Sequence, residues 1–298
     1  MTAITLLDGS IGQEIVKRSG DRATPLWSTS VMMEKPDIVG DVHADYFRTG
    51  ATIATANTYA VHVDRLARVG LEAEHLHLLD TAMDQALSAR DAHGSGRIAV
   101  SLGPLGASYR PDIEVPLPEA AAAFAAIVTH LDSRADLFII ETASSLHQAR
   151  GALMGCASTG KPVWLAITVD DDDGTRLRSG ESVSDIAELA SEFAPQALLI
   201  NCSRPEAIAA GLDLLKPIGL PFGAYANGFT RITQAFLTDA PTVDALEQRR
   251  DLGPAEYARF AMGWVALGAT IVGGCCEVGP AHIEEFARQL KAAGHTIA

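Results

Sequence analysis

The sequence predicts an α/β protein that folds as a (β/α)8 barrel, organised as a single domain over residues 1–298. Short apolar or β-branched runs alternate along the chain with longer segments of helical period, which is the pattern of βα units on a parallel sheet. Eight such runs can be counted. Eight strands with eight helices in about 250 to 300 residues match the size of this barrel.

The elements follow one another in a regular order. Strands are predicted at residues 4–8, 52–57, 98–102, 137–141, 163–168, 197–201, 222–225 and 270–273. Crossover helices, amphipathic or Ala-rich, are predicted at residues 118–134, 146–159, 184–193, 204–215 and 254–267. Residues 19–33 and 228–253 show no regular period, so they are expected to be irregular. A doubly wound open sheet is the main alternative, but its Gly-x-Gly-x-x-Gly is missing, since the first strand leads into Asp8-Gly9-Ser10-Ile11-Gly12-Gln13.

The composition disfavours nucleic acid and anionic membranes as partners. The formal net charge is −14, and Lys and Arg are not clustered along the sequence. The N-terminal stretch lacks the positive region of a signal peptide, and no apolar run reaches the roughly 18 residues of a membrane span. We therefore expect a cytoplasmic protein that acts on small molecules.

Three of the four cysteines follow predicted strands. Cys202 comes directly after strand 197–201, and Gly274-Cys275-Cys276 follows strand 270–273. In a barrel of parallel strands these thiols would converge at one mouth. Three sulfur ligands with one position left open describe a catalytic zinc site, because a structural site would close the tetrahedron with a fourth protein ligand. A Zn²⁺ ion would also keep the neighbouring thiolates ionised.

Other interpretations of these residues stay open. Cys275 and Cys276 could form a disulfide between neighbours or a redox dithiol, and all three cysteines could be small buried hydrophobic residues. Cys156, in a helical stretch, is expected to pack in the core. His43 is expected on a long helix as a structural or surface residue. Residues 170–173, all Asp, lack the spacing of an EF-hand and are expected in a solvated loop.

Polar residues recur where the predicted strands end, which is where active sites form in this fold. Asp8, Thr55, Asn57, Glu141, Asn201 and Asn227 hold such positions and are expected to face one pocket. The Asp8 and Glu141 carboxylates could hold the ammonium group of an amino-acid substrate. They could equally be helix caps or partners of an arginine in a loop.

Together these residues resemble the homocysteine S-methyltransferase family, which includes betaine–homocysteine methyltransferase and the homocysteine module of methionine synthase. The resemblance spans nearly the whole chain. It is carried most specifically by Asn201-Cys202 and by Gly273-Gly274-Cys275-Cys276 followed by Pro280-Ala281-His282-Ile283. Further motifs are Leu6-Leu7-Asp8-Gly9-Ser10, Thr55-Ala56-Asn57-Thr58-Tyr59, Ser101-Leu102-Gly103-Pro104 and Glu141-Thr142.

The resemblance implies a zinc-dependent barrel domain that binds homocysteine. Zinc would be bound by Cys202, Cys275 and Cys276, and Asp8 and Glu141 would contact the amino group. Gly9, Thr55, Asn57, Asn201 and Asn227 would complete the substrate pocket. The thiolate would attack a methyl group on a sulfonium or quaternary ammonium donor and give methionine. S-methylmethionine is the first choice of donor, followed by S-adenosylmethionine and betaine, since the sequence shows no cobalamin module.

The chain departs from the family pattern in three loops. Ser10 replaces the usual second glycine after Asp-Gly, Glu277-Val278-Gly279 replaces a Gly-Thr-Thr type segment, and Tyr225-Ala226-Asn227 stands where Tyr-Pro-Asn is more usual. None of these removes a metal ligand. They leave two alternatives: a related thiol or selenol methyltransferase with another acceptor, or a zinc-binding barrel without turnover.

Overall fold

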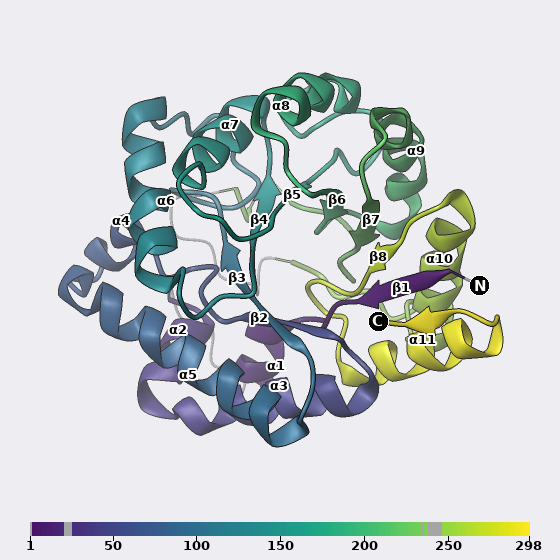
Figure 1. Cartoon of the computed structure of the whole chain (residues 1–298), viewed down its shortest axis with the longest axis horizontal. Coiled ribbons are helices and arrows are strands. Elements are labelled where there is room, and N and C mark those ends of the chain that lie inside the picture. Colours follow the sequence, from purple (N-terminus) through teal and green to yellow (C-terminus); the bar gives the residue numbers. More distant parts are fainter. Residues whose placement is uncertain (1, 21–25, 234, 238–245) are drawn as a thin grey trace.

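A ring of parallel strands occupies the middle of the molecule, and helices cover its outer side (Figure 1). The computed structural model describes residues 2–20, 26–233, 235–237 and 246–298. The strands are β1 (Ala3–Leu6), β2 (Ile53–Ala56), β3 (Arg97–Leu102), β4 (Leu137–Ala143), β5 (Val163–Ile167), β6 (Ala197–Asn201), β7 (Phe222–Tyr225), β8 (Ile271–Val272) and β9 (Thr296–Ile297).

The sheet has the order β2-β3-β4-β5-β6-β7-β8-β1-β9, and every pair in it is parallel. β1 also meets β2, because Leu7 and Ile53 form a parallel bridge and the Asp8 N–H donates to the Ile53 carbonyl at 3.1 Å. β1 to β8 thus close the predicted (β/α)8 barrel. β9, which the sequence pattern did not predict, adds to β1 at Ala3 and Ile4.

The helices pack around the outside of the barrel (Figure 1). They are α1 (Ile11–Arg18), α2 (Ser28–Glu34), α3 (Pro36–Thr49), α4 (Val63–Ala67), α5 (His75–His93), α6 (Leu117–Leu131), α7 (Leu146–Gly155), α8 (Ile186–Phe193), α9 (Pro205–Leu215), α10 (Pro254–Leu267) and α11 (Pro280–Ala292). Three 3₁₀ turns are η1 (Glu72–Glu74), η2 (Val183–Asp185) and η3 (Lys216–Ile218). α3 and α10 each begin at a proline and end before a glycine with φ of 111°.

The predicted elements agree with these bounds to within a few residues, except in one of the two irregular stretches. α2 begins at Ser28, inside residues 19–33, where no helix was predicted, and ends at Glu34, and residues 21–25 of that stretch are outside the described part. In residues 228–253 the described segments contain a bridge between Phe229 and Gln248 and no helix.

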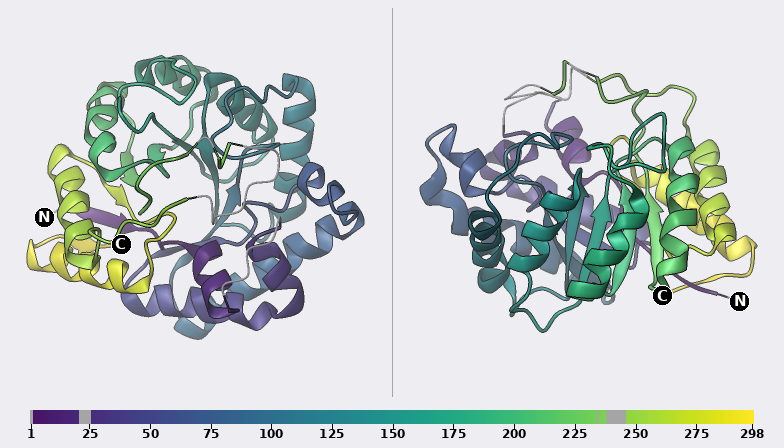
Figure 2. Two further views of the ribbon diagram at one scale, coloured as in Figure 1. Left: turned by 180° about the vertical axis from the view of Figure 1, so that it is seen from behind. Right: turned by 90° about the horizontal axis from the view of Figure 1, so that it is seen from above.

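Two apolar layers stabilise the barrel, one inside the ring of strands and one between the strands and the helices. Alternate strand residues such as Ala197 and Leu199 point into the barrel, where they pack with Trp164 and Ile139. Their neighbours on β6, including Ile200, belong to the larger core beneath the helices. Figure 2 shows the long connections gathered at the end of the barrel opposite the two termini. Within the described ranges, no helix is both long and apolar enough to span a membrane.

Candidate metal and substrate site

A cavity of about 340 Å³ lies where the barrel strands end. Eight of the ten residues predicted for the site line this cavity: Gly9, Thr55, Asn57, Glu141, Asn201, Cys202, Cys275 and Cys276. Asp8 and Asn227 are buried behind the wall rather than in it. The strand ends therefore bring together residues that are up to 268 positions apart, from Asp8 to Cys276.

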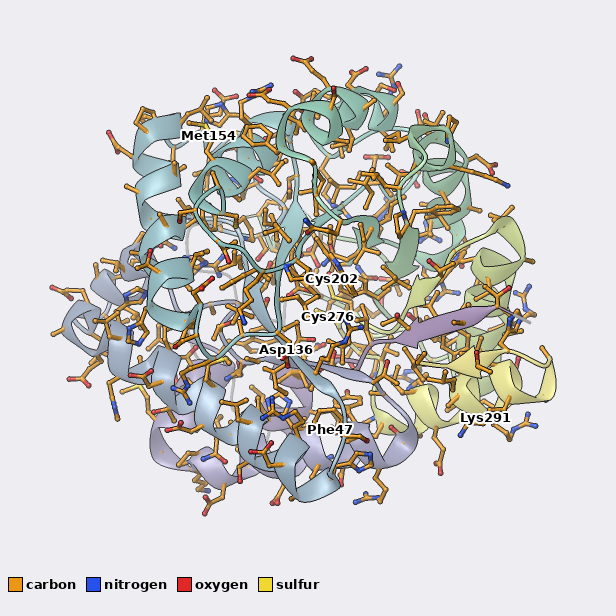
Figure 3. The ribbon with its side chains drawn as sticks, in the orientation of Figure 1. Phe47, Asp136, Met154, Cys202, Cys276 and Lys291 are labelled. Atoms are coloured by element: carbon orange, nitrogen blue, oxygen red, sulfur yellow. A yellow bond between two sulfur atoms is a disulfide. The ribbon has the colours of Figure 1, made fainter. Side chains whose placement is uncertain are left out.

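Cys202 and Cys276 lie near the centre of the ring (Figure 3), and together with Cys275 they form a compact group. Their Sγ atoms all lie within 4.8 Å of one another, and no fourth potential ligand joins the group among the described residues. The Sγ atoms of Cys202 and Cys276 are 3.6 Å apart. Tetrahedral zinc, with Zn–S bonds of about 2.3 Å, places two sulfurs about 3.8 Å apart, so this spacing fits zinc with one open position.

The structure joins Cys202 and Cys275 in a disulfide, whereas Cys276 is a free thiol. The sequence had favoured three thiolates, and the disulfide considered there was between the neighbours Cys275 and Cys276. Metal binding requires the Cys202–Cys275 bond to be reduced, because zinc is bound by thiolates. Burial, followed by the charges of Glu277 and Glu141, raises the pKa of Cys276 to about 12. A bound cation would reverse this effect and hold the sulfur as a thiolate.

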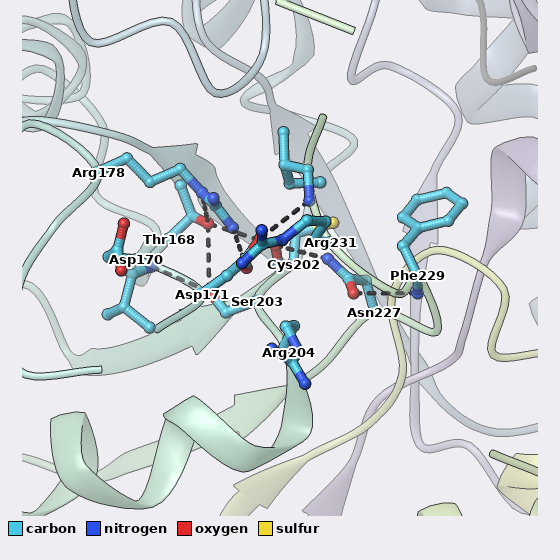
Figure 4. Close-up of polar contacts among 12 residues, drawn as sticks. Thr168, Asp170, Asp171, Arg178, Cys202, Ser203, Arg204, Asn227, Phe229 and Arg231 are labelled. Atoms are coloured by element: carbon cyan, nitrogen blue, oxygen red, sulfur yellow. Dashed lines mark hydrogen bonds and ion pairs between the residues drawn. The ribbon is translucent and has the colours of Figure 1, made fainter. Parts of the chain in front are cut away.

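Hydrogen bonds hold Cys202 in an unusual backbone conformation. Its φ is 48°, in the left-handed region that residues with a side chain seldom adopt. Its N–H donates to the Tyr225 carbonyl at 3.0 Å. Its carbonyl accepts from the Asn227 Nδ2 at 2.9 Å and from the Thr168 hydroxyl at 3.3 Å (Figure 4). Asn227 thus fixes a candidate metal ligand instead of facing the substrate cavity.

The support of Cys202 extends to an ion pair with little exposure. Arg178 Nε donates to the Thr168 hydroxyl at 3.0 Å, and Arg178 Nη2 lies 2.9 Å from Asp171 Oδ1 (Figure 4). The Asp171 side chain is only 8% exposed. The expected solvated loop is therefore wrong at this position. The Arg178 guanidinium also lies 4.8 Å from the ring centroid of Tyr109, which lines the cavity.

Close backbone packing explains two glycines of the site. A Cβ on Gly9 would lie 2.1 Å from the Val278 carbonyl oxygen, and one on Gly274 would lie 2.3 Å from Val278 Cγ1. Both distances are too short for any side chain. The loops after β1 and β8 can approach each other only because these positions are glycine.

Asp8 is a buried carboxylate held by one residue. It is 2% exposed, and Thr55 donates to it twice, through the backbone N–H to Oδ2 at 2.5 Å and through the hydroxyl to Oδ1. Burial raises the pKa of Asp8 to about 8, with the nearby Glu141 carboxylate adding to it and the Thr55 hydrogen bonds opposing it. Among the described residues, no cationic group is one of the main contributors to this pKa.

Glu141 is the second carboxylate. Its Oε1 accepts from the Tyr225 hydroxyl at 2.7 Å, and its Oε2 accepts from the Ser101 hydroxyl. Burial raises its pKa, although these two hydrogen bonds lower it. Neither carboxylate caps a helix or pairs with a loop arginine in the described part of the chain, as their bonds run to Thr55, Ser101 and Tyr225. A cation entering the cavity would meet Glu141 in its wall, with the carboxyl group of Asp8 behind it.

The two remaining amides have bonds of their own. Asn201 donates through Nδ2 to the Thr142 hydroxyl at 2.9 Å and accepts from the Thr142 N–H at 2.9 Å. Thr142 has a φ of 60°, so Asn201 fixes the end of β4 beside Glu141. Asn57 accepts from the Ser28 hydroxyl at 2.8 Å and directs Nδ2 at Met32 Sδ, 3.6 Å away.

Two departures from the family pattern are in contact through Gln13. The Ser10 hydroxyl donates to Gln13 Oε1 at 3.0 Å, and the same oxygen accepts from the Glu277 N–H at 2.7 Å. Gln13 Nε2 donates in turn to the Glu277 carboxylate. The changes at Ser10 and Glu277 thus form one polar link between α1 and the loop that carries Cys275 and Cys276.

Sequence reasoning missed several residues of the site. Ser101 and Tyr225 support Glu141, and both stand at strand ends, so the same positional signal could have found them. The position of a residue at a strand end could not reveal the aromatic side chains that line the cavity, because these residues lie in loops without a regular sequence pattern. These are Trp27, Tyr59, Tyr109, Phe229 and Phe236.

Three predictions outside the cavity can be compared with the structure. Cys156 is 4% exposed and packs in the core, as expected. His43 lies on α3 and is fully buried, so it is a structural residue and not a surface one. Among the described residues, the aspartates at 170–173 join no group of possible metal ligands.

Comparison with known proteins agrees with this geometry. The family model described as homocysteine S-methyltransferase matches residues 5–290. The homocysteine S-methyltransferase of Escherichia coli (strain K12) is 31% identical, with 94% of this chain and 93% of that protein covered. The protein named homocysteine S-methyltransferase YbgG of Bacillus subtilis (strain 168) is 27% identical, with 97% and 96% covered.

A solved structure of a homocysteine methyltransferase also has a similar fold. The metallated form of the homocysteine methyltransferase MmuM from Escherichia coli has a TM-score of 0.81 and 28% identity, covering 97% of this chain and 96% of that one. The match of the family model over nearly the whole chain, together with this fold and its cysteine group, shows that the chain belongs to the homocysteine S-methyltransferase family.

Proposed function

We propose that this protein is a zinc-dependent enzyme that transfers a methyl group from a small cationic donor to the thiol of L-homocysteine, giving methionine. The observation that carries the proposal is the group of three cysteine sulfurs in the wall of a cavity that also contains Glu141. Cys202, Cys275 and Cys276 would hold the zinc. Zinc bound there would accept the homocysteine sulfur in its open position and lower the pKa of that thiol.

The protein's own groups orient the acceptor. The Asp8 and Glu141 carboxylates would hold the homocysteine ammonium group, since Asp8 is buried, Glu141 is half-buried in the cavity wall, and neither has an ion-pair partner in the described part of the chain. Thr55, Ser101 and Tyr225 keep the two carboxylates in place through hydrogen bonds. With the ammonium fixed, the sulfur is restricted to one direction of attack.

The methyl transfer is a displacement at carbon. The homocysteine sulfur forms a bond to the methyl carbon, and the bond from that carbon to the donor sulfur or nitrogen breaks, leaving its electron pair on the donor. The donor leaves as a neutral thioether or amine, so no general acid is needed. The proton of the homocysteine thiol is released to solvent.

The cavity wall supports a cationic donor. Tyr109, Phe229 and Trp27 line it, and aromatic faces attract sulfonium and quaternary ammonium groups. S-methylmethionine is the first donor to test because of the family resemblance of the sequence motifs, and S-adenosylmethionine and betaine follow.

The test is methionine formation by reduced, zinc-loaded protein that receives L-homocysteine and each of the three donors separately. The Cys276→Ala protein is the matched control. We expect turnover with one donor, S-methylmethionine first, and none in the control. Turnover only with another thiol or a selenol would indicate a related methyltransferase whose acceptor is not homocysteine. Zinc binding without methyl transfer from any donor would indicate a non-catalytic zinc barrel.

A further inference from the structure

Arg65 places a guanidinium in the wall of the same cavity. It lies on α4, after β2, and lines the cavity beside Tyr59. Its Nη2 donates to the Pro104 carbonyl at 2.7 Å, and its Cζ lies 5.6 Å from the ring centroid of Tyr59. Its Nε is buried and has no hydrogen-bond acceptor among the described residues.

The charge of Arg65 is not neutralised by an ion pair. Among the described residues no carboxylate lies within ion-pair distance of it, and the neighbouring Asp64 directs Oδ2 at the Gly106 N–H, 2.6 Å away. Burial lowers the pKa of Arg65, while the nearby Tyr59 and Asp64 oppose this shift. An arginine stays protonated in proteins and offers five N–H donors in a planar fork. Its free donors therefore suit an oxyanion.

The other guanidiniums near the cavity differ from Arg65. Arg178 is paired with Asp171 at 2.9 Å, so an acid already compensates its charge. Arg68 donates to the Gly106 carbonyl at 3.0 Å and is exposed, so solvent screens its charge.

Tyr59 connects Arg65 with the carboxylate pair. It interacts electrostatically with both Arg65 and Glu141, and its hydroxyl shares a hydrogen bond of 2.7 Å with Ser108. One cavity wall therefore contains both the Glu141 carboxylate and the Arg65 guanidinium, together with Tyr59. This charge pattern is complementary to a zwitterionic α-amino acid, whose ammonium and carboxylate carry opposite charges.

We propose that Arg65 binds the α-carboxylate of an amino-acid substrate in this cavity. The proposal rests on the proposed function, because that function supplies two ligands with such a carboxylate: the acceptor L-homocysteine and an amino-acid donor such as S-methylmethionine. The shared chemistry is a guanidinium–carboxylate pair. The experiment must show which of the two substrates provides it.

The experiment compares Arg65→Gln and Arg65→Lys with wild type. KM is measured for homocysteine and for the donor separately, and binding of each amino acid to the zinc-loaded protein is measured by calorimetry. Arg48→Gln is the matched control, since Arg48 is 71% exposed and pairs with Asp45 on the surface. Analogues without a carboxylate are used in parallel: 3-aminopropanethiol for the acceptor and (3-aminopropyl)dimethylsulfonium for the donor.

We expect Arg65→Gln to weaken the binding of one substrate by roughly 10- to 100-fold, which is the usual effect of losing a charged hydrogen bond. Binding of the other substrate should change much less. Arg65→Lys should recover part of the loss, and Arg48→Gln should match wild type. The analogue of the affected substrate should bind wild type and Arg65→Gln equally well. A larger KM for homocysteine assigns the carboxylate to the acceptor, and a larger KM for the donor assigns it to the donor.

Two failures can be told apart. If wild type binds and turns over both substrates but Arg65→Gln changes neither affinity, the role of Arg65 is wrong and the proposed function stands. If wild type neither binds homocysteine nor forms methionine, the proposed function fails and this inference fails with it. If circular dichroism shows that Arg65→Gln does not fold, binding to the wild-type protein provides the test. The inference is overturned if wild type binds each substrate and its carboxylate-free analogue equally well.

Discussion

Asn227, after β7, donates its side-chain amide to the carbonyl oxygen of Cys202, after β6, at 2.9 Å. Its Oδ1 accepts from the Phe229 N–H at 3.2 Å, so the one amide ties two loops together. Cys202 has a φ of 48° and needs such support to keep its sulfur beside that of Cys276. A residue outside the cavity wall thereby helps to determine the geometry of the cysteine group.

We predict that Asn227→Asp weakens zinc binding by roughly 10- to 100-fold, the usual effect of losing a residue that orients a metal ligand. Aspartate keeps the acceptor for Phe229 but replaces the donor to Cys202 with a second oxygen. The measurement is competition for zinc with a chelator of known affinity. The thermal midpoint of the metal-free variant serves as the control for folding, and unchanged zinc affinity would remove Asn227 from this role.

Each cysteine of the group should be required for metal. Cys202→Ala and Cys276→Ala are expected to lose both bound zinc and turnover, because two sulfurs cannot replace a three-sulfur site. Cys156→Ala is the matched control: it should keep full zinc content and lose only about 1 kcal/mol of stability from core packing. Metal analysis of the reduced proteins checks this. Activity retained by either Cys202→Ala or Cys276→Ala would exclude the zinc mechanism.

The buried Asp8 should destabilise the protein when no ligand or metal is bound. Its pKa is about 8 in the fold against an ordinary value of 3.8, so the folded state binds more protons than the unfolded state between these pH values. Stability therefore falls as pH rises through this window. Asp8→Asn removes the titration and can still bond Thr55. We expect its thermal midpoint to exceed that of wild type by a margin that grows from pH 5 to pH 8.

Melting curves of both metal-free proteins across that range provide the test of Asp8. A margin that stays constant with pH would mean that Asp8 is ionised in the fold. The same variant should bind homocysteine weakly at every pH, since it has lost a negative charge near the ammonium group.

His43 should make the protein sensitive to acid. Both ring nitrogens are buried and have no hydrogen-bond partner in the part of the chain that the structure describes, and burial lowers the pKa of His43 to about 4 from 6.5. The unfolded state takes up a proton below about pH 6.5, whereas the folded state does not, so stability falls as pH falls toward 4. His43→Leu should lose less stability than wild type between pH 7 and pH 5. Denaturant unfolding at both pH values measures this, and equal losses would contradict it.

The sequence predicts most of the barrel because each strand is a short apolar run between helical segments. β6 and β7 begin and end where the pattern indicated. β9 has only two residues, Thr296–Ile297, and forms by pairing with β1, which is a tertiary effect that periodicity does not report. α2 was missed because its seven residues, Ser28–Glu34, are too few to show a helical period.

The role of a site residue could be predicted from the sequence where its residue type has one main function at such a position. The prediction was less accurate where the residue type has several functions. Thiols at strand ends indicate a metal, and the three cysteines do come together. Asparagine is ambiguous, because an amide can contact a substrate or brace a loop. Asn201 lines the cavity yet bonds Thr142 at both ends, and Asn227 braces Cys202 from behind the wall. Only the three-dimensional contacts separate these roles.

The most direct test of the account is methionine formation from L-homocysteine and S-methylmethionine as zinc is added back to reduced, chelator-treated protein. The account predicts that activity is absent without zinc, rises linearly with added zinc and stops rising at one equivalent per chain. Full activity in the zinc-free protein would contradict the central claim, as would zinc-loaded protein that forms no methionine with any of the three donors.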